Sequence, residues 1–224
     1  MALSFAIAAE GKTDQRVIEN ILVGFFRSSV DDLVVDWDHP AHQQQGKKDE
    51  SWGNWLNVLE YLRRRSYADV FQFHDYLVIQ IDTDCSDQTG FDVPSQIEGS
   101  KRTADEMIAA VREKLASLID QGDLQAYSGK FLFAVCVNSI ECWLLPLHCP
   151  DKAGDENNCL HKVNAGLRRQ GEELLRKNYV PSYANASAHY CRERILLSEG
   201  PKQRSLARFL EILDSIKSAP ATGS

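Results

Sequence analysis

Runs of apolar residues alternate with amphipathic segments over the first two thirds of the chain. Three of these runs, at 4–9, 76–81 and 131–137, have the length and composition of buried strands, and a second short strand is predicted at 33–37. Between them, apolar residues recur at intervals of three and four, which predicts helices at 13–26, 52–65 and 103–120. Strands that alternate with helices over short connections form parallel sheets with right-handed crossovers. The expected fold class is therefore α/β, with a mostly parallel, four-stranded, Rossmann-like sheet flanked by helices.

Beyond residue 150 only helical patterns remain, and they lie at 158–177, 188–197 and 202–216. We therefore expect an α/β domain at 1–150 and a helical C-terminal extension, packed on it, at 151–217. The last residues, 218–224, have the sequence SAPATGS and are predicted to form a disordered tail.

Local signals set the expected ends of these elements. Thr13 is suited to cap the first helix. In the second helix, Leu56 is expected to face the core. Polar loops are predicted at 39–51 and 82–101. Pro146 is expected to break the short apolar helix or turn that follows the fourth strand.

Carboxylates follow three of the four predicted strands. Glu10 and Asp14 follow the first strand, Asp82 and Asp84 the third, and Glu141 the fourth. Because the carboxyl ends of parallel strands lie at one edge of a sheet, these groups are expected to meet there. Carboxylates so close together repel one another unless a cation lies between them. Oxygen ligands favour a hard divalent ion, so the sequence predicts a site for Mg²⁺ or Mn²⁺.

Each of these carboxylates has an ordinary explanation when it is considered alone. Glu10 with the following glycine is typical of a turn, and Glu141 in an apolar stretch could be paired with an arginine. Asp87 and Asp92 lie in a polar loop, where solvation is the usual state. The convergence of three strand ends on one edge is what favours a metal site over these explanations.

Composition narrows the function classes. The 224 residues are 43% hydrophobic and 25% charged, which is typical of a globular protein. The net charge of −7 argues against coating nucleic acid through bulk positive charge. No apolar run approaches the roughly 20 residues of a membrane span, so no membrane partner is expected. The run LSFAIAA is interpreted as a strand and not a signal peptide.

The six cysteines are scattered and form no CxxC pair. They are expected to be reduced thiols in a cytoplasmic protein. A zinc set is the alternative, and its members would be Cys142, Cys149, Cys159 and His161. Their spacings fit no regular zinc motif.

Three motifs resemble those of a known fold. AAEGKTD, at 8–14, resembles the Glu-Gly-x-x-Asp opening of the TOPRIM fold, which topoisomerases of types IA and II, primases and OLD-family nucleases share. IDTD, at 81–84, resembles the Asp-x-Asp motif of that fold. VNSIECWLLP, at 137–146, resembles a third motif of OLD-type and small stand-alone TOPRIM proteins. The resemblance covers roughly residues 4–147.

The resemblance implies a divalent-metal-dependent nuclease, an endonuclease or nickase, with a role in antiviral defence. The carboxylates would hold two Mg²⁺ or Mn²⁺ ions, and they are Glu10, Asp14, Asp82, Asp84 and Glu141. OLD nucleases also use a late lysine, a role that Lys177 or, alternatively, Lys202 would take. The expected nucleic-acid contacts are basic residues near the first motif and in the helical extension, namely Lys12, Arg168, Arg169, Arg176 and Lys202.

Two other readings remain open. The 224 residues contain no ATPase domain like the one that precedes TOPRIM in OLD proteins, so the chain could be a subunit active only with a separate ATPase partner. IDTD also resembles the aspartate motif of haloacid-dehalogenase-like phosphatases, in which Asp82 would be the nucleophile. That reading leaves the Glu10 motif unexplained. The oligomeric state is left open, with a homo-oligomer among the options.

Overall fold

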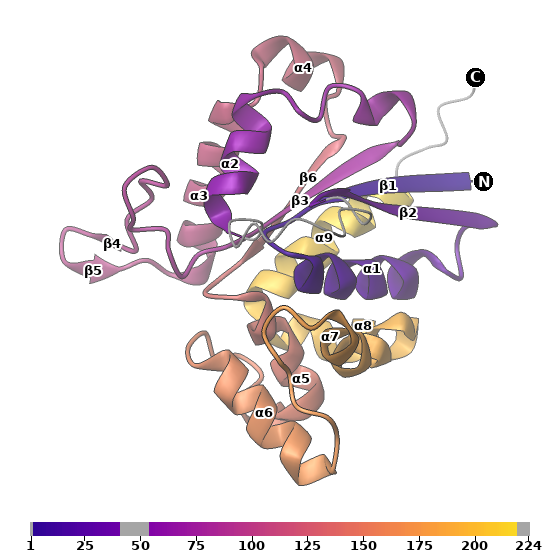
Figure 1. Cartoon of the computed structure of the whole chain (residues 1–224), viewed down its shortest axis with the longest axis vertical. Coiled ribbons are helices and arrows are strands. Elements are labelled where there is room, and N and C mark those ends of the chain that lie inside the picture. Colours follow the sequence, from indigo (N-terminus) through magenta and orange to yellow (C-terminus); the bar gives the residue numbers. More distant parts are fainter. Residues whose placement is uncertain (1, 41–53, 219–224) are drawn as a thin grey trace.

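The four predicted strands are present, and all of them pair in parallel. The computed structural model describes residues 2–40 and 54–218, and its main sheet has the strand order β2-β1-β3-β6 (Figure 1). The strands are β1 (Ala2–Ala8), β2 (Asp32–His39), β3 (Tyr76–Asp82) and β6 (Phe131–Cys136). The predicted α/β class with a parallel four-stranded sheet is therefore confirmed, and it is compatible with a Rossmann-like fold.

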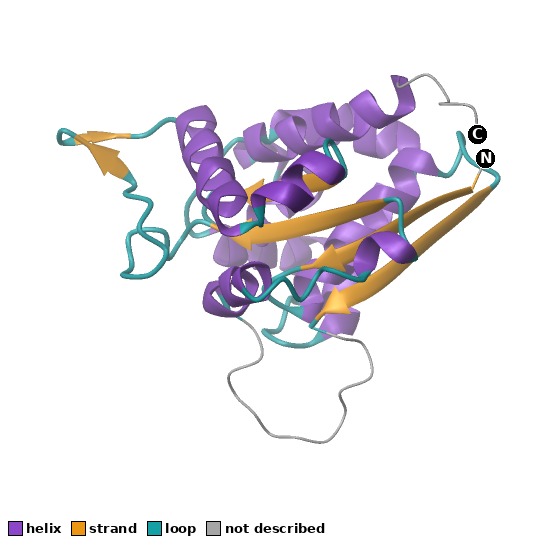
Figure 2. Cartoon of the chain, turned by 90° about the horizontal axis from the view of Figure 1, so that it is seen from above, coloured by secondary structure: helices purple, strands orange, loops and turns teal. Residues whose placement is uncertain are grey.

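Helices cover both faces of this sheet (Figures 1 and 2). On one face, α1 (Lys12–Phe26) packs against Phe5 and Ile7 of β1, together with the C-terminal helices. On the other face, α2 (Trp55–Arg63) and α3 (Ala104–Leu118) cover Ala6 and Ala8. Alternate residues of β1 thus enter two separate cores, as the period of two in a strand requires.

The remaining helices lie in the second half of the chain. They are α4 (Gln121–Ala126), α5 (Leu145–His148), α6 (Cys159–Gln170), α7 (Val180–Ser187), α8 (Glu193–Glu199) and α9 (Arg204–Ser218). Short 3-10 helices connect several elements, and they are η1 (Val70–Gln72), η2 (Ile140–Leu144), η3 (Pro150–Lys152), η4 (Ala188–Cys191) and η5 (Gly200–Lys202). Side chains of α1 and of the C-terminal helices share one hydrophobic core.

Three local predictions about the helices are wrong. The helix predicted from Thr13 begins at Lys12, and its N-cap is Gly11, whose carbonyl accepts from the N–H of Asp14 at 3.2 Å. In α2, Leu56 is 44% exposed and not buried, because it lies on the opposite side of the helix from the core residues. Pro146 does not break a helix but stands in the first turn of α5, where its missing N–H costs nothing.

Other elements were not predicted from the sequence patterns, or were predicted with a different end. The predicted loop 82–101 contains a hairpin of β4 (Gln96–Ile97) and β5 (Ser100–Lys101), which projects from the body of the chain (Figure 2). The helix predicted at 158–177 ends at Gln170, because Gly171 adopts the left-handed conformation with φ of 73°. Helices α4 and α7 were not predicted.

Two cysteines are joined, contrary to the expectation of six reduced thiols. Cys142 in η2 and Cys159 at the start of α6 form a disulfide, which brings together segments 17 residues apart. The alternative zinc set loses two of its four members to this bond. Cys149 instead donates to the carbonyl of Lys162, and its sulfur lies 3.1 Å from Arg169 Nη2.

Two predicted segments fall wholly or partly outside the described residues. The predicted polar loop 39–51 is described only as far as Pro40, and the predicted tail only at Ser218, the last residue of α9. Among the helices of residues 2–40 and 54–218, none combines the length and the hydropathy of a membrane span.

Candidate metal centre

The ends of β1 and β3 are held together by a short chain of hydrogen bonds. The N–H of Asp82 donates to Glu10 Oε1 at 2.7 Å, and the N–H of Glu10 donates to Gln80 Oε1 at 3.2 Å. Gln80 Nε2 then donates to Asp82 Oδ1 at 2.8 Å. Because Gln80 is fully buried in the sheet, it fixes the backbone of Glu10 and the carboxylate of Asp82 relative to the strands.

Asp14 lies behind these strand ends, in the first turn of α1. Its side chain is only 8% exposed, and Gly11 allows it to approach, since a Cβ at Gly11 would lie 3.0 Å from Asp14 Oδ2. Burial raises the pKa of Asp14 well above its usual range, and the charges of Glu10 and Glu141 raise it further. The structure thus brings the carboxylates of β1, α1 and η2 within electrostatic range.

Glu141 reaches the same edge from the segment after β6. The carbonyl of Asn138, a residue with φ of 67°, accepts from the N–H groups of Thr83 and Asp84 at 3.0 Å each. These bonds dock the turn after β6 onto the end of β3. Glu141 follows in η2, where its Oε1 accepts a hydrogen bond of 2.6 Å from the hydroxyl of Tyr183 in α7.

Burial and repulsion by neighbouring carboxylates raise the pKa values of Glu10 and Asp82. Burial raises the pKa of Glu10 to about 7, with further increases from Asp84 and Glu141, while N–H groups of Asp82 and Trp55 lower it. The pKa of Asp82 lies well above its usual range, because of burial first and then the charges of Glu10, Asp14, Glu141 and Asp84. All five predicted carboxylates are therefore neighbours in the fold.

The donor set fits a hard divalent cation. Every member is a carboxylate, and the groups that raise the pKa values of Glu10, Asp14 and Asp82 are other carboxylates together with burial. A divalent ion would neutralise this repulsion and would be ligated by oxygen, as Mg²⁺ and Mn²⁺ prefer. In their present positions, the described residues include no group of three His, Cys, Asp or Glu side chains that could hold one metal ion.

Lys177 is linked to this region only through its charge. It is exposed, and its charge acts on the thiol of Cys85, the residue that follows Asp84. The pKa of Cys85 is raised to about 11, first by burial and then by Asp84, and Lys177 opposes this rise. Lys12 is the first residue of α1, two positions after Glu10.

The other predicted nucleic-acid contacts lie in the helical segment. Arg176 pairs with Glu173, and its guanidinium lies over the ring of Tyr179. Lys202 Nζ is 2.7 Å from Glu199 Oε2. Arg168 and Arg169 lie in the last turn of α6, where positive charge suits the helix dipole. Arg176 is adjacent in sequence to Lys177 and so belongs to the same part of the surface.

Sequence reasoning missed Tyr183 and Gln80. Tyr183 lies 42 residues after Glu141 in a helix whose amphipathic pattern is weak, so no motif indicated it. Gln80 could have been found, because an amide in the middle of a strand buried on both faces must satisfy its hydrogen bonds at a specific place.

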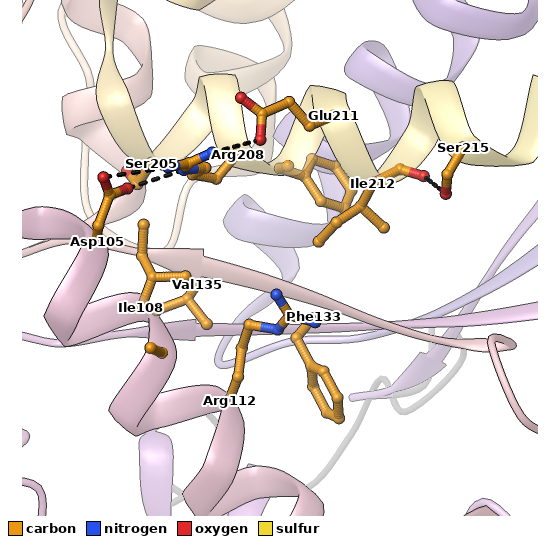
Figure 3. A pocket seen from close by; sticks show the side chains of 12 residues that line it. Asp105, Ile108, Arg112, Phe133, Val135, Ser205, Arg208, Glu211, Ile212 and Ser215 are labelled. Atoms are coloured by element: carbon orange, nitrogen blue, oxygen red, sulfur yellow. Dashed lines mark hydrogen bonds and ion pairs between the residues drawn. The ribbon is translucent and has the colours of Figure 1, made fainter.

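A cavity of about 450 Å³ lies elsewhere, between α3 and α9 and along the edge strand β6 (Figure 3). Phe133 and Val135 of β6 line it together with Arg112 of α3. Asp105 and Arg208 bridge its two helical walls, with Oδ1 and Nε 2.8 Å apart. Its lining contains none of the five carboxylates, so it is separate from the candidate metal centre.

Comparison of the chain with protein-family models, with curated proteins and with solved structures found no match. The structure itself supports an α/β class with a parallel sheet and a cluster of carboxylates at the carboxyl ends of three strands. Any function assigned to the chain therefore depends on that cluster.

Proposed function

We propose that the chain is a divalent-metal-dependent nuclease with a TOPRIM-type centre. The observation that carries the proposal is the meeting of five carboxylates at one sheet edge, and they are Glu10, Asp14, Asp82, Asp84 and Glu141. Their order along the chain, at or after the ends of β1, β3 and β6, supports the resemblance to TOPRIM proteins. A carboxylate cluster of this kind is the common protein contribution to metal-assisted phosphodiester hydrolysis.

The five carboxylates would form two ion-binding sites. Asp82 and Asp84 would hold one Mg²⁺ or Mn²⁺ ion, with Glu10 beside them, and Asp14 and Glu141 would complete a second site. Ions bound there supply an activated water and neutralise charge on the phosphoryl oxygens. The role of the five side chains would be to hold such ions at the ends of the strands.

Other groups of the chain handle protons and substrate charge. In the metal-free chain the pKa of Glu10 is raised to about 7, so its carboxyl is partly protonated near neutral pH, and a divalent ion bound beside it would displace that proton. Tyr183 holds Glu141 in place by its hydrogen bond. Lys177, which is exposed, would bind a phosphate oxygen of the substrate.

Plasmid nicking tests the proposal. The purified chain is incubated with supercoiled plasmid in EDTA, Mg²⁺ or Mn²⁺, beside a Glu10→Gln, Asp82→Asn double variant. Asp214→Asn, a substitution of an exposed carboxylate on α9, is the matched control. We expect metal-dependent nicking by the wild type and the control and none by the double variant. Nicking that persists in EDTA, or in the double variant, would refute the proposal.

A partner-dependent subunit is the second candidate. Arg176 and Lys202 already pair with Glu173 and Glu199 of their own segment, which weakens the field they can offer to nucleic acid. In that case the wild type binds Mn²⁺ in calorimetry but nicks plasmid only after co-expression with a separate ATPase chain. Nicking by the isolated chain would exclude this candidate.

A further inference from the structure

The short segment between α6 and α7 carries the exposed Lys177 and the partly exposed ring of Tyr179, over which lies Arg176, a cation that also pairs with Glu173. We propose that Arg176, Lys177 and Tyr179 form a binding site for single-stranded nucleic acid, in which an unpaired base stacks on Tyr179. The proposal rests on the nuclease function and specifies its substrate class. DNA and RNA share the base face that such a site would bind.

The segment is held in a defined conformation. The N–H of Tyr179 donates to the carbonyl of Arg176 at 3.0 Å, and the N–H of Arg176 donates to Ser182 Oγ at 3.2 Å. The same Oγ donates to the carbonyl of Tyr179 at 2.8 Å, and Ser182 is fully buried. A platform that is already ordered loses little conformational entropy when a ligand binds.

The platform lies next to the carboxylates. Tyr179 immediately precedes α7, and one turn later Tyr183 of that helix donates its hydrogen bond to Glu141. In Figure 1 the segment runs from α6 back toward the end of the sheet where the strands finish. A nucleotide held on the platform would therefore present its phosphate to the centre.

The ring of Tyr179 is suited to stacking. It is 40% exposed, and the guanidinium carbon of Arg176 lies 4.3 Å from its centroid. Arginine stacked on an aromatic ring makes an extended, positively charged platform, and every base has a face that can stack on it. Of the phenylalanine, tyrosine and tryptophan side chains in the described residues, Phe73 is the other one with a large exposed surface.

Stacking selects unpaired bases. In a duplex, neighbouring base pairs cover both faces of each base, so Tyr179 could reach only a base that is splayed out or single-stranded. The net charge of −7 also disfavours binding along a long duplex, where most affinity comes from many phosphate contacts. The Lys177 charge and the ring of Tyr179, with Arg176 held over it by Glu173, fit the few contacts of a single flexible strand better.

Fluorescence anisotropy with labelled oligonucleotides tests the site. The probes are oligo-dT, oligo-rU and a duplex of equal length, at one fixed low salt concentration. Binding is measured in EDTA and again in Ca²⁺, with wild type, Tyr179→Ala and Tyr179→Phe. Phe73→Ala is the matched control. Phe73 lies shortly before β3, at the amino ends of the strands, whereas the carboxylates lie at their carboxyl ends.

We expect Tyr179→Ala to weaken single-strand binding about tenfold, while Tyr179→Phe and Phe73→Ala stay within about twofold of the wild type. Lys177→Ala is expected to reduce the slope of log affinity against log salt concentration by about one, as the loss of one phosphate contact would. Comparable dT and rU affinities would show that the base face is the shared target, and a preference for one would identify the substrate.

Equal effects of Tyr179→Ala and Phe73→Ala would overturn the proposal, as would duplex binding as tight as single-strand binding. A wild type that binds neither oligonucleotide in EDTA or Ca²⁺ would overturn it as well. Failure of the nuclease function gives a different result, namely Tyr179-dependent binding without cleavage in Mg²⁺ or Mn²⁺. Plasmid nicking that Tyr179→Ala leaves unchanged, with unchanged binding, would refute only the single-strand site.

Discussion

The hydroxyl of Tyr183 donates a hydrogen bond of 2.6 Å to Glu141 Oε1, and this contact connects α7 to the carboxylates at the sheet edge. It shows that the C-terminal helices do more than cover a face of the sheet. They also position one of the five acidic side chains.

The first prediction concerns this bond. Tyr183→Phe keeps the buried ring but removes the donor to Glu141. Since a hydrogen bond to a charged group contributes about 1.5–3 kcal/mol, we expect Mn²⁺ affinity and the nicking rate to fall about tenfold or more. Tyr190→Phe is the control, because it removes an equally buried donor whose acceptor is the carbonyl of Trp143. Equal effects of both variants on Mn²⁺ affinity would contradict the positioning role.

The second prediction is a pH dependence of stability in EDTA. Burial and neighbouring charges raise the pKa of Glu10 from 4.5 to about 7 in the folded chain. Between these values the folded state binds more protons than the unfolded state, so the free energy of unfolding falls as pH rises. Glu10 alone accounts for about 3 kcal/mol, and Asp14 and Asp82 act in the same direction.

Urea denaturation in EDTA from pH 4 to 8 measures this loss. Mn²⁺ at saturating concentration is expected to restore stability above pH 7, because the ion replaces the protons. Asp82→Asn is expected to reduce the slope, and Asp214→Asn, on exposed α9 surface, to leave it unchanged. A slope that Asp82→Asn leaves unchanged would show that the carboxylates are not gathered as described, because groups elsewhere with lowered pKa values, such as Asp105 and His39, affect both chains alike.

The third prediction concerns the contact between α1 and the C-terminal helices. A Cβ added at Gly24 would lie 1.8 Å from the carbonyl oxygen of Tyr190. Alanine normally stabilises a helix relative to glycine, but here we expect Gly24→Ala to destabilise the chain by about 1–3 kcal/mol. Thermal unfolding measures the change. In the control Gly154→Ala, the nearest atom, Lys202 O, lies at 3.7 Å, so little change is expected.

The fourth prediction concerns the disulfide between Cys142 and Cys159. It closes a loop with a sequence separation of 17, so its reduction is expected to lower the free energy of unfolding by about 3 kcal/mol. Alkylation of the denatured, unreduced chain should modify only the free thiols, which are Cys85, Cys136, Cys149 and Cys191. Modification of all six cysteines without prior reduction would show that the bond is absent.

The sheet was predictable, because a parallel strand buried on both faces is a nearly continuous apolar run. Each predicted strand overlaps the observed one, and Glu10, Asp82 and Glu141 follow the strands as expected. Short elements were not predictable. The hairpin β4–β5 has two residues in each strand, and α7 has eight residues with a weak apolar stripe, so neither leaves a clear pattern.

The sequence by itself determined most of the strands and helices and the acidic residues at the strand ends, because side chains that face the core recur at the period of the element that carries them. Only the tertiary structure decided which distant groups complete the centre. The contact of Tyr183 with Glu141 and the disulfide of Cys142 with Cys159 join segments that share no local pattern. Such contacts depend on how helices pack across the sheet, and packing is a property of the whole chain and not of any one segment.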